Sequence, residues 1–175
     1  NVPERNPDTC IQCNQCAFVC PHATIRPFAL TADEAAKAPA ALKSKAMNGK
    51  GCENYVFAMT VSPMDCMGCG VCVNVCPTSA TKGTLKMVPQ ESQLAQQEVF
   101  NYCVENVRKK DGMMAETTVK GSQFNQPLLE FSGSCAGCAE TAYARLVTQL
   151  FGERMYISNA TGCSSIWGGP AATSP

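Results

Sequence analysis

The chain has 175 residues, with 14 Lys and Arg against 14 Asp and Glu and a formal net charge of zero at pH 7. That balance offers no basic surface for nucleic acid or for an anionic membrane, so we expect neither as a partner. Hydrophobic residues make up 45% and charged residues 16%, which excludes a disordered chain, and the 13 cysteines are the unusual number.

The N-terminal segment carries no targeting signal that we recognise. It is polar and interrupted by proline, and no apolar stretch reaches the roughly 18 residues that span a bilayer. The sequence begins with Asn1 rather than Met, and we expect it to be a piece of a longer cytoplasmic protein. In such a setting cysteines are interpreted as metal ligands before disulfides, and an odd count rules out complete internal pairing.

The first motif in chain order is C-I-Q-C-N-Q-C-A-F-V-C-P, followed by a segment, 26–54, that we interpret as an insertion. Thr31 and Glu34 form a capping-box pair ahead of an Ala-rich helix, and Pro39 is suited to begin a second short helix. Two glycines then break the pattern, and residues 55–61 are predicted to form a strand.

The second motif, C-M-G-C-G-V-C-V-N-V-C-P, repeats the spacing of the first, C-x2-C-x2-C-x3-C-P. In this pattern the first three cysteines wrap one [4Fe–4S] cluster, and the fourth, followed by Pro, supplies the open corner of the other. The predicted ligands are Cys10, Cys13, Cys16 and Cys76 for one cluster, and Cys66, Cys69, Cys72 and Cys20 for the other. Structural zinc is the alternative, but zinc sites use four ligands in two pairs.

The region after the second motif is predicted to contain a strand at 85–88 and an amphipathic helix at 93–109. Three basic residues stand at the end of that helix, where positive charge suits the helix dipole, and Asp111 with Gly112 is expected to stop it. Residues 112–127 are interpreted as a linker. Cys103 and Cys52 lie outside the motifs, and we expect both to be packing residues.

The last segment changes character. A short apolar stretch at 128–131, a helix from Ala139 to Leu150, a strand at 155–157 and a polar loop at 159–169 suggest the opening of an α/β domain. We therefore divide the chain into 1–120 and 121–175. The expected fold class is α+β, with a two-cluster ferredoxin-like domain that carries an insertion. The resemblance described next implies that this domain is followed by the incomplete start of a thiamine-diphosphate-binding domain.

Two stretches, F-S-G-S-C-A-G-C-A-E-T and S-N-A-T-G-C-S-S-I-W-G-G, resemble the pyruvate:ferredoxin (or flavodoxin) oxidoreductase family. They resemble it at the point where its ferredoxin-like domain meets its thiamine-diphosphate-binding domain. The repeat, the inserted segment and this stretch occur in the family's order, so the resemblance covers nearly the whole chain. Where that family usually has C-G-E-T, this sequence has Ala139 in place of the glycine.

The resemblance implies three ligands of a third [4Fe–4S] cluster, Cys135, Cys138 and Cys163, with the fourth ligand outside this sequence. It also implies that Glu140 and Cys163 contact thiamine diphosphate, which the full-length protein binds with Mg²⁺. The alternative is a lone C-x-x-C redox pair at a helix start, which would leave Cys163 unexplained.

The family's reaction is the oxidation of pyruvate with coenzyme A to acetyl-CoA and CO₂. In that family, electrons pass through the three clusters to ferredoxin or flavodoxin, and the enzyme is commonly a homodimer. We expect these 175 residues to be inactive alone and to contain no catalytic residue. The alternatives are a stand-alone ferredoxin-type carrier, an oxidoreductase for another 2-oxoacid, and a zinc-stabilised interaction module.

Overall fold

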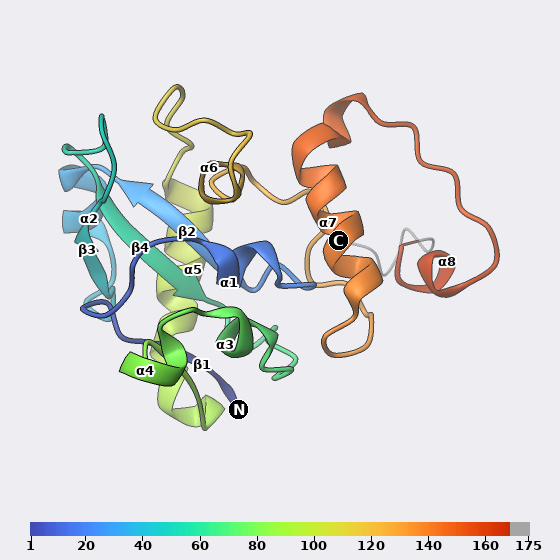
Figure 1. Cartoon of the computed structure of the whole chain (residues 1–175), viewed down its shortest axis with the longest axis horizontal. Coiled ribbons are helices and arrows are strands. Elements are labelled where there is room, and N and C mark those ends of the chain that lie inside the picture. Colours follow the sequence, from blue (N-terminus) through green and yellow to red (C-terminus); the bar gives the residue numbers. More distant parts are fainter. Residues whose placement is uncertain (169–175) are drawn as a thin grey trace.

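The computed structural model describes residues 1–168, which form short helices around two small antiparallel sheets (Figure 1). The strands are β1 (Val2–Arg5), β2 (Ile25–Leu30), β3 (Ser44–Ala46), β4 (Val56–Val61) and β5 (Leu85–Val88). The helices are α1 (Gln15–Phe18), α2 (Ala32–Lys37), α3 (Val71–Val75), α4 (Ser79–Lys82), α5 (Ala95–Asn106), α6 (Val119–Ser122), α7 (Ala139–Phe151) and α8 (Cys163–Trp167), with 3₁₀ turns η1 (Gln90–Gln93) and η2 (Gly152–Arg154). Within this range no helix is long and apolar enough to cross a bilayer.

Two strand pairs hold the cysteine repeat in place. β1 pairs with β5, with Val2 opposite Val88, and β2 pairs with β4, with Ile25 opposite Val61. One cysteine block follows β1 and leads into α1, and the other follows β4 and leads into α3. Because α1 and α3 pack together, the two blocks are brought face to face. The strands expected at 55–61 and 85–88 are confirmed, and the mixture of helices and antiparallel strands agrees with an α+β fold.

The segment between β2 and β4 differs in part from expectation. The interpreted insertion, 26–54, starts inside β2, so the excursion from the sheet begins only after Leu30. α2 has the expected capping box. The second short helix at Pro39 is wrong: Leu42 N–H donates to the Pro39 carbonyl and closes one turn. Ala38 is extended because a residue before proline disfavours the helical conformation, and β3 then begins at Ser44.

α5 confirms the helix expected after the second block, but it is shorter than 93–109. Val107 is extended, so Arg108, Lys109 and Lys110 lie beyond the helix end, and Asp111 with Gly112 does not stop it. α5 packs on β4 and contributes Val99 and Cys103 to an apolar cluster, which Val107 joins from just beyond the helix end. A basic residue just outside the helix pairs with the insertion instead: Lys110 Nζ lies 2.7 Å from Glu34 Oε1.

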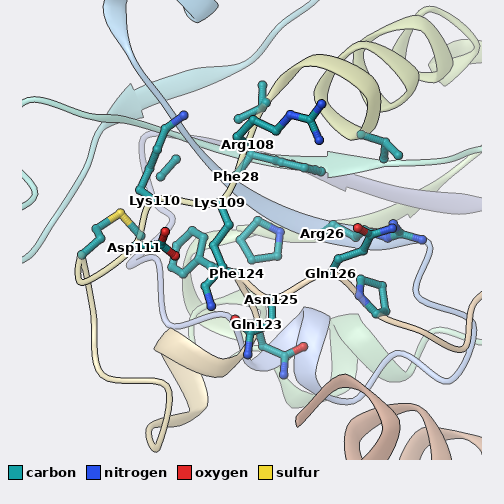
Figure 2. A pocket seen from close by; sticks show the side chains of 16 residues that line it. Arg26, Phe28, Arg108, Lys109, Lys110, Asp111, Gln123, Phe124, Asn125 and Gln126 are labelled. Atoms are coloured by element: carbon teal, nitrogen blue, oxygen red, sulfur yellow. The ribbon is translucent and has the colours of Figure 1, made fainter. Parts of the chain in front are cut away.

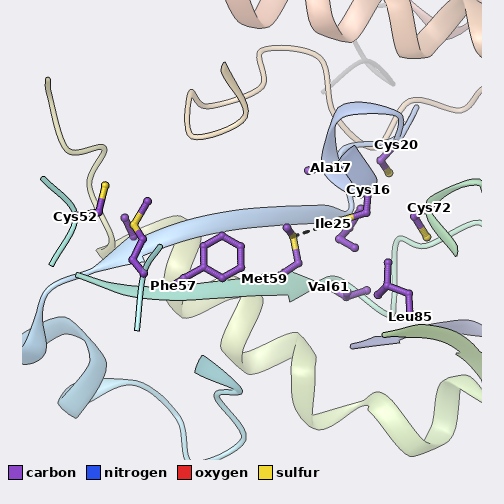
Figure 3. Close-up of a cluster of buried hydrophobic side chains, with 12 residues drawn as sticks. Cys16, Ala17, Cys20, Ile25, Cys52, Phe57, Met59, Val61, Cys72 and Leu85 are labelled. Atoms are coloured by element: carbon purple, nitrogen blue, oxygen red, sulfur yellow. Dashed lines mark hydrogen bonds between the residues drawn. The ribbon is translucent and has the colours of Figure 1, made fainter. Parts of the chain in front are cut away.

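The main core is continuous with the cysteine blocks (Figure 3). Ile25, Phe57, Met59 and Leu85 form one buried cluster with several of the cysteines. Those cysteines are Cys16, Cys20, Cys52 and Cys72. The apolar core and the predicted ligands therefore occupy the same small volume, so packing and metal binding depend on each other.

Residues 112–168 depart most from expectation. The predicted linker contains α6, whose first turn is capped by the Thr118 hydroxyl, which accepts from Gly121 N–H at 3.0 Å. The strand expected at 155–157 is wrong, and its Tyr156 and Ile157 are exposed. The apolar stretch 128–131 is not a strand either. An extended segment becomes a strand only by pairing, and neither segment pairs within residues 1–168.

The polar loop expected at 159–169 is partly helical, since α8 occupies its second half. Gly169 and the remainder of the second predicted domain, 170–175, lie outside the described residues. The predicted boundary at residue 120 falls within α6.

α7 confirms the helix expected in this region, but it buries its polar side. An amphipathic helix ordinarily turns its apolar stripe to the core. Here Thr141, Arg145 and Gln149 are buried, whereas Tyr143 and Val147 are exposed. Its polar side meets a polar surface: α7 lies beside the end of α1 (Figure 1), where Arg145 donates to the backbone carbonyls of Ala17 and Phe18.

Candidate metal centres

The first quartet of cysteines lines one small cavity. Its members are Cys10, Cys13, Cys16 and Cys76. Cys10 and Cys13 come from the loop before α1, Cys16 from α1 itself, and Cys76 follows α3, so this cavity draws its cysteines from both blocks. Met59 of β4 also lines the cavity, and its sulfur lies 4.0 Å from Cys16 Sγ (Figure 3).

The second quartet lines a separate cavity of the same kind. Its members are Cys20, Cys66, Cys69 and Cys72, again three from one block and one from the other. Backbone N–H groups support it, since Gly68 N–H faces the sulfur of Cys66. The two cavities meet through α1, which carries Cys16 into the first and leads directly to Cys20 in the second.

Burial and mutual repulsion act on the thiols of both quartets. Burial, followed by the neighbouring thiols of Cys72, Cys10 and Cys13, raises the pKa of Cys16 well above its ordinary value. Burial and then the Cys20 thiol raise the pKa of Cys72 to about 12. Converging thiolates in a buried site repel one another, and a bound cationic centre removes that cost. This donor set therefore fits a metal cluster held by thiolates.

Cys76 is the exception among these thiols. Burial alone would raise its pKa, but hydrogen bonds from Ser79 and Thr78, first from their side chains and then from their backbone, lower it overall. The cysteine that the first cavity takes from the other block therefore loses its proton more readily than an ordinary cysteine.

The loops between the cysteines adopt the same backbone with different residues. Gln12 and Asn14 have φ of 60°, and the matching positions of the second block, Gly68 and Gly70, have φ of 68° and 74°. The left-handed region suits glycine and costs other residues energy. No role was expected for Gln12 and Asn14 from the sequence, although an alignment of the two blocks matches them with glycines.

Hydrogen bonds hold the two non-glycine residues in this conformation. Gln12 Nε2 donates to the Ala46 carbonyl at 2.8 Å, and its Oε1 accepts from Asn48 N–H at 2.7 Å. Asn14 Nδ2 donates to the Lys120 carbonyl at 2.8 Å. Both side chains are 1% exposed. The loop of the first block is therefore tied to the insertion and to α6.

The third predicted set is only partly brought together. Cys138 N–H donates to the Cys135 carbonyl at 3.1 Å, so these two cysteines share one turn before α7. Cys163 begins α8 and is exposed, as are Cys135 and Glu140, the latter in the first turn of α7. Hydrogen bonding by Thr141, first by its hydroxyl and then by its backbone, lowers the pKa of Cys138.

The Cys135–Cys138 turn packs against the second quartet. A Cβ on Gly137 would lie 3.4 Å from Cys69 Cβ and 3.5 Å from a methyl of Val71. Cys138 and Val71 also line a shared apolar cavity of about 250 Å³. The third set therefore adjoins the cavity of the second quartet.

Three further residues of metal-binding type, His22, Cys52 and Cys103, have the surroundings of structural residues. His22 is buried, contacts the Ser132 carbonyl through Nδ1 at 3.1 Å, and lines the cavity of the second quartet. Cys52 and Cys103 are fully buried, as packing residues should be. All 13 cysteines fall within residues 1–168 and none forms a disulfide. In that range no three Cys, His, Asp or Glu side chains converge on a single-ion site.

The largest cavity lies away from the cysteines (Figure 2). It has about 360 Å³ and lies between β2, the end of α5 and residues 123–127. Its basic residues are already paired in several places: Arg26 with Glu130, and Lys109 with Glu116. The two cysteine cavities, rather than this one, are therefore the candidate functional sites.

Residues 9–80 match the family model described as a 4Fe-4S dicluster domain. The match includes both cysteine blocks and supports iron–sulfur binding by this part of the chain.

Longer proteins match the whole chain. A pyruvate-flavodoxin oxidoreductase of Klebsiella pneumoniae is 53% identical over 99% of this chain, and a pyruvate:ferredoxin oxidoreductase of Moorella thermoacetica is 51% identical over 100%. A mitochondrial pyruvate dehydrogenase [NADP(+)] of Euglena gracilis is 48% identical over 99%. The chain spans 14%, 15% and 9% of these proteins, respectively. The resemblance drawn from the sequence is thus confirmed: the chain is similar over its whole length to a segment of proteins named pyruvate-flavodoxin or pyruvate:ferredoxin oxidoreductase.

Proposed function

We propose that the chain is the electron-relay portion of a pyruvate:ferredoxin or pyruvate:flavodoxin oxidoreductase. The observation that carries the proposal is the pair of crossed cysteine quartets, each lining its own cavity. Cys10, Cys13, Cys16 and Cys76 would hold one [4Fe–4S] cluster, and Cys66, Cys69, Cys72 and Cys20 the other. Such clusters supply one-electron transfer at low potential when bound.

The order of the relay is supported by packing. Because Gly137 lies against Cys69, the turn that carries Cys135 and Cys138 adjoins the second quartet rather than the first. We therefore place the second quartet between the third cysteine set and the first quartet. Cys163 would complete the chain's share of the third site, with a further ligand from elsewhere in the full-length protein.

The remaining assignments concern the full-length protein. Glu140 and Cys163 would contact thiamine diphosphate, bound with Mg²⁺, and residues 121–175 would begin the domain that binds it. Pyruvate and coenzyme A would be the substrates, in a cytoplasmic homodimer. Ferredoxin or flavodoxin would be the acceptor, although the printed name of the Euglena relative contains NADP(+) instead, so this segment does not by itself select the acceptor.

The alternative of a stand-alone carrier has less support. Residues 121–175 also match the long relatives, and a two-cluster ferredoxin would need no third cysteine set. Another 2-oxoacid as substrate stays open in this segment, because none of its residues is assigned to substrate binding.

The test uses the full-length enzyme. In Cys163→Ser, we expect the two repeat clusters to remain while the rate at which pyruvate and coenzyme A reduce them falls sharply. Stopped-flow absorbance measures that rate, and iron analysis with about eight irons in the repeat region verifies the two clusters. Cys52→Ser, outside every site, is the control. An unchanged rate in Cys163→Ser would overturn the enzyme relay, and zinc in place of iron would overturn the cluster assignment.

A further inference from the structure

Arg145 is a buried cation at the junction of α7 and α1. Its side chain is 1% exposed. Nη2 donates to the carbonyls of Phe18 at 2.6 Å and Ala17 at 3.2 Å, and Nη1 donates to Gln149 Oε1 at 2.7 Å and Gln123 Oε1 at 3.4 Å. All four acceptors are neutral. The guanidinium is thus well held but, through these contacts, not neutralised.

Residues 1–168 provide no carboxylate partner for this guanidinium, whereas the nearby Arg26 pairs with Glu130. Burial lowers the pKa of Arg145 to about 10, and the Cys20 thiolate opposes that change. The side chain is therefore still charged at neutral pH. A buried charge without a counter-charge costs several kcal/mol, so a negative group is expected beside it.

The position of Arg145 identifies that group. Ala17 and Phe18 belong to the end of α1, and the chain reaches Cys20 directly after it. Cys20 lines the cavity of the second quartet, where four thiolates would concentrate negative charge. The carbonyl contacts hold the guanidinium at this end of the helix, and α7, which carries Arg145, begins at the turn that adjoins Cys69 of the second quartet.

We propose that Arg145 is the buried counter-charge of the cluster held by Cys20, Cys66, Cys69 and Cys72, and that it raises the reduction potential of that cluster. The inference rests on the proposed function, because it needs the cluster to be present. Reduction adds one negative charge, and a fixed cation in a poorly solvated site stabilises the reduced form more than the oxidised form. The thiolate that acts on the charge of Arg145 is that of Cys20, so the cluster of the first quartet should respond less.

The experiment is a redox titration of the full-length enzyme followed by electron paramagnetic resonance, which resolves each cluster. Arg145→Gln removes the charge, Arg145→Lys keeps it with fewer donors, and Arg154→Gln removes an exposed charge as the matched control. For Arg145→Gln we expect at least a tenfold loss in the reduction equilibrium of one cluster, a shift of about 59 mV to more negative potential. Arg145→Lys and Arg154→Gln should leave the potential close to wild type.

Each outcome decides the inference. Equal shifts in Arg145→Gln and Arg145→Lys would overturn it, because a change in packing and not in charge would then explain the shift. No shift in Arg145→Gln would also overturn it, because Arg145 would then have no effect on the reduction potential. If Arg145→Gln does not retain the cluster, the potential of Arg145→Lys decides alone: near wild type supports the proposal, and a tenfold loss overturns it. A wild-type enzyme without iron in the repeat would instead overturn the proposed function.

Discussion

The two cysteine blocks share their spacing and their backbone, yet their surroundings are opposite. In the first block, Gln12 and Asn14 are buried and bonded to the insertion and to α6. In the second, Gly68 has an exposed position and Gly70 has open space around it. The cysteine spacing alone sets the path of the loop, whereas the residues between the cysteines determine whether the loop is tied down or left accessible.

The difference has a functional meaning within the proposed relay. The tied loop surrounds the first quartet, and the open loop leaves Cys69 accessible to the turn around Gly137. A Cβ at Gly68 would lie 2.9 Å from the Asn1 carbonyl oxygen, whereas a Cβ at Gly70 would meet no atom within 4 Å. An open loop is therefore found where one candidate centre must come close to the next.

Replacement of the cysteine that each cavity takes from the other block gives the largest expected effect. It tests whether the two blocks depend on each other. Cys20→Ala should remove the cluster of the second block, and Cys76→Ala that of the first, although each residue lies in the opposite block. The reason is that each cavity takes its fourth cysteine from the other block. Each variant should lose about four irons, and electron paramagnetic resonance should show which signal disappears. Loss of the same signal in Cys20→Ala and Cys10→Ala would contradict the crossing.

Replacement of the tied side chains sharpens the comparison. Gln12→Gly keeps the left-handed backbone but loses two buried hydrogen bonds, so the free energy of unfolding should fall by about 2 kcal/mol, at about 1 kcal/mol per bond. The matched change Gly70→Asn meets no atom within 4 Å, and asparagine tolerates this conformation, so its effect should stay below about 1 kcal/mol. Anaerobic denaturant unfolding measures both. Similar losses in the two variants would show that the hydrogen bonds between Gln12 and the insertion do not stabilise the fold.

A thiol that belongs to neither block provides the smallest effect and a reference for both. Burial, followed by the charge of Glu34, raises the pKa of Cys103 to about 12. A folded-state pKa above the unfolded value means that stability is complete below pH 9 and is lost as the pH rises from 9 towards 12. We expect a loss of about 1 kcal/mol by pH 10, absent in Cys103→Ala. Thermal unfolding at pH 8 and pH 10 compares the two proteins, and equal losses would refute the assignment.

Local patterns were sufficient wherever the interaction is local. The capping box at Thr31 and the strands around Phe57 and Leu85 follow from neighbouring residues and from short, mainly apolar runs. The expected strand at 155–157 failed for the complementary reason, because a strand requires a partner that local sequence does not provide. The helix predicted at Pro39 was wrong because the chain closes only one turn there before it enters β3 at Ser44.

The sequence by itself determined the chemistry of the candidate centres, because thiolate ligands at this spacing leave few alternatives to paired iron–sulfur clusters. Only the tertiary structure decided what surrounds them. Gln12, Asn14 and Arg145 bond to backbone groups that are distant along the chain, and no local pattern encodes such contacts. α7 is the clearest case: its sequence favours a buried apolar stripe, but Arg145 donates to the carbonyls of Ala17 and Phe18 at the end of α1, and the helix buries its polar stripe instead.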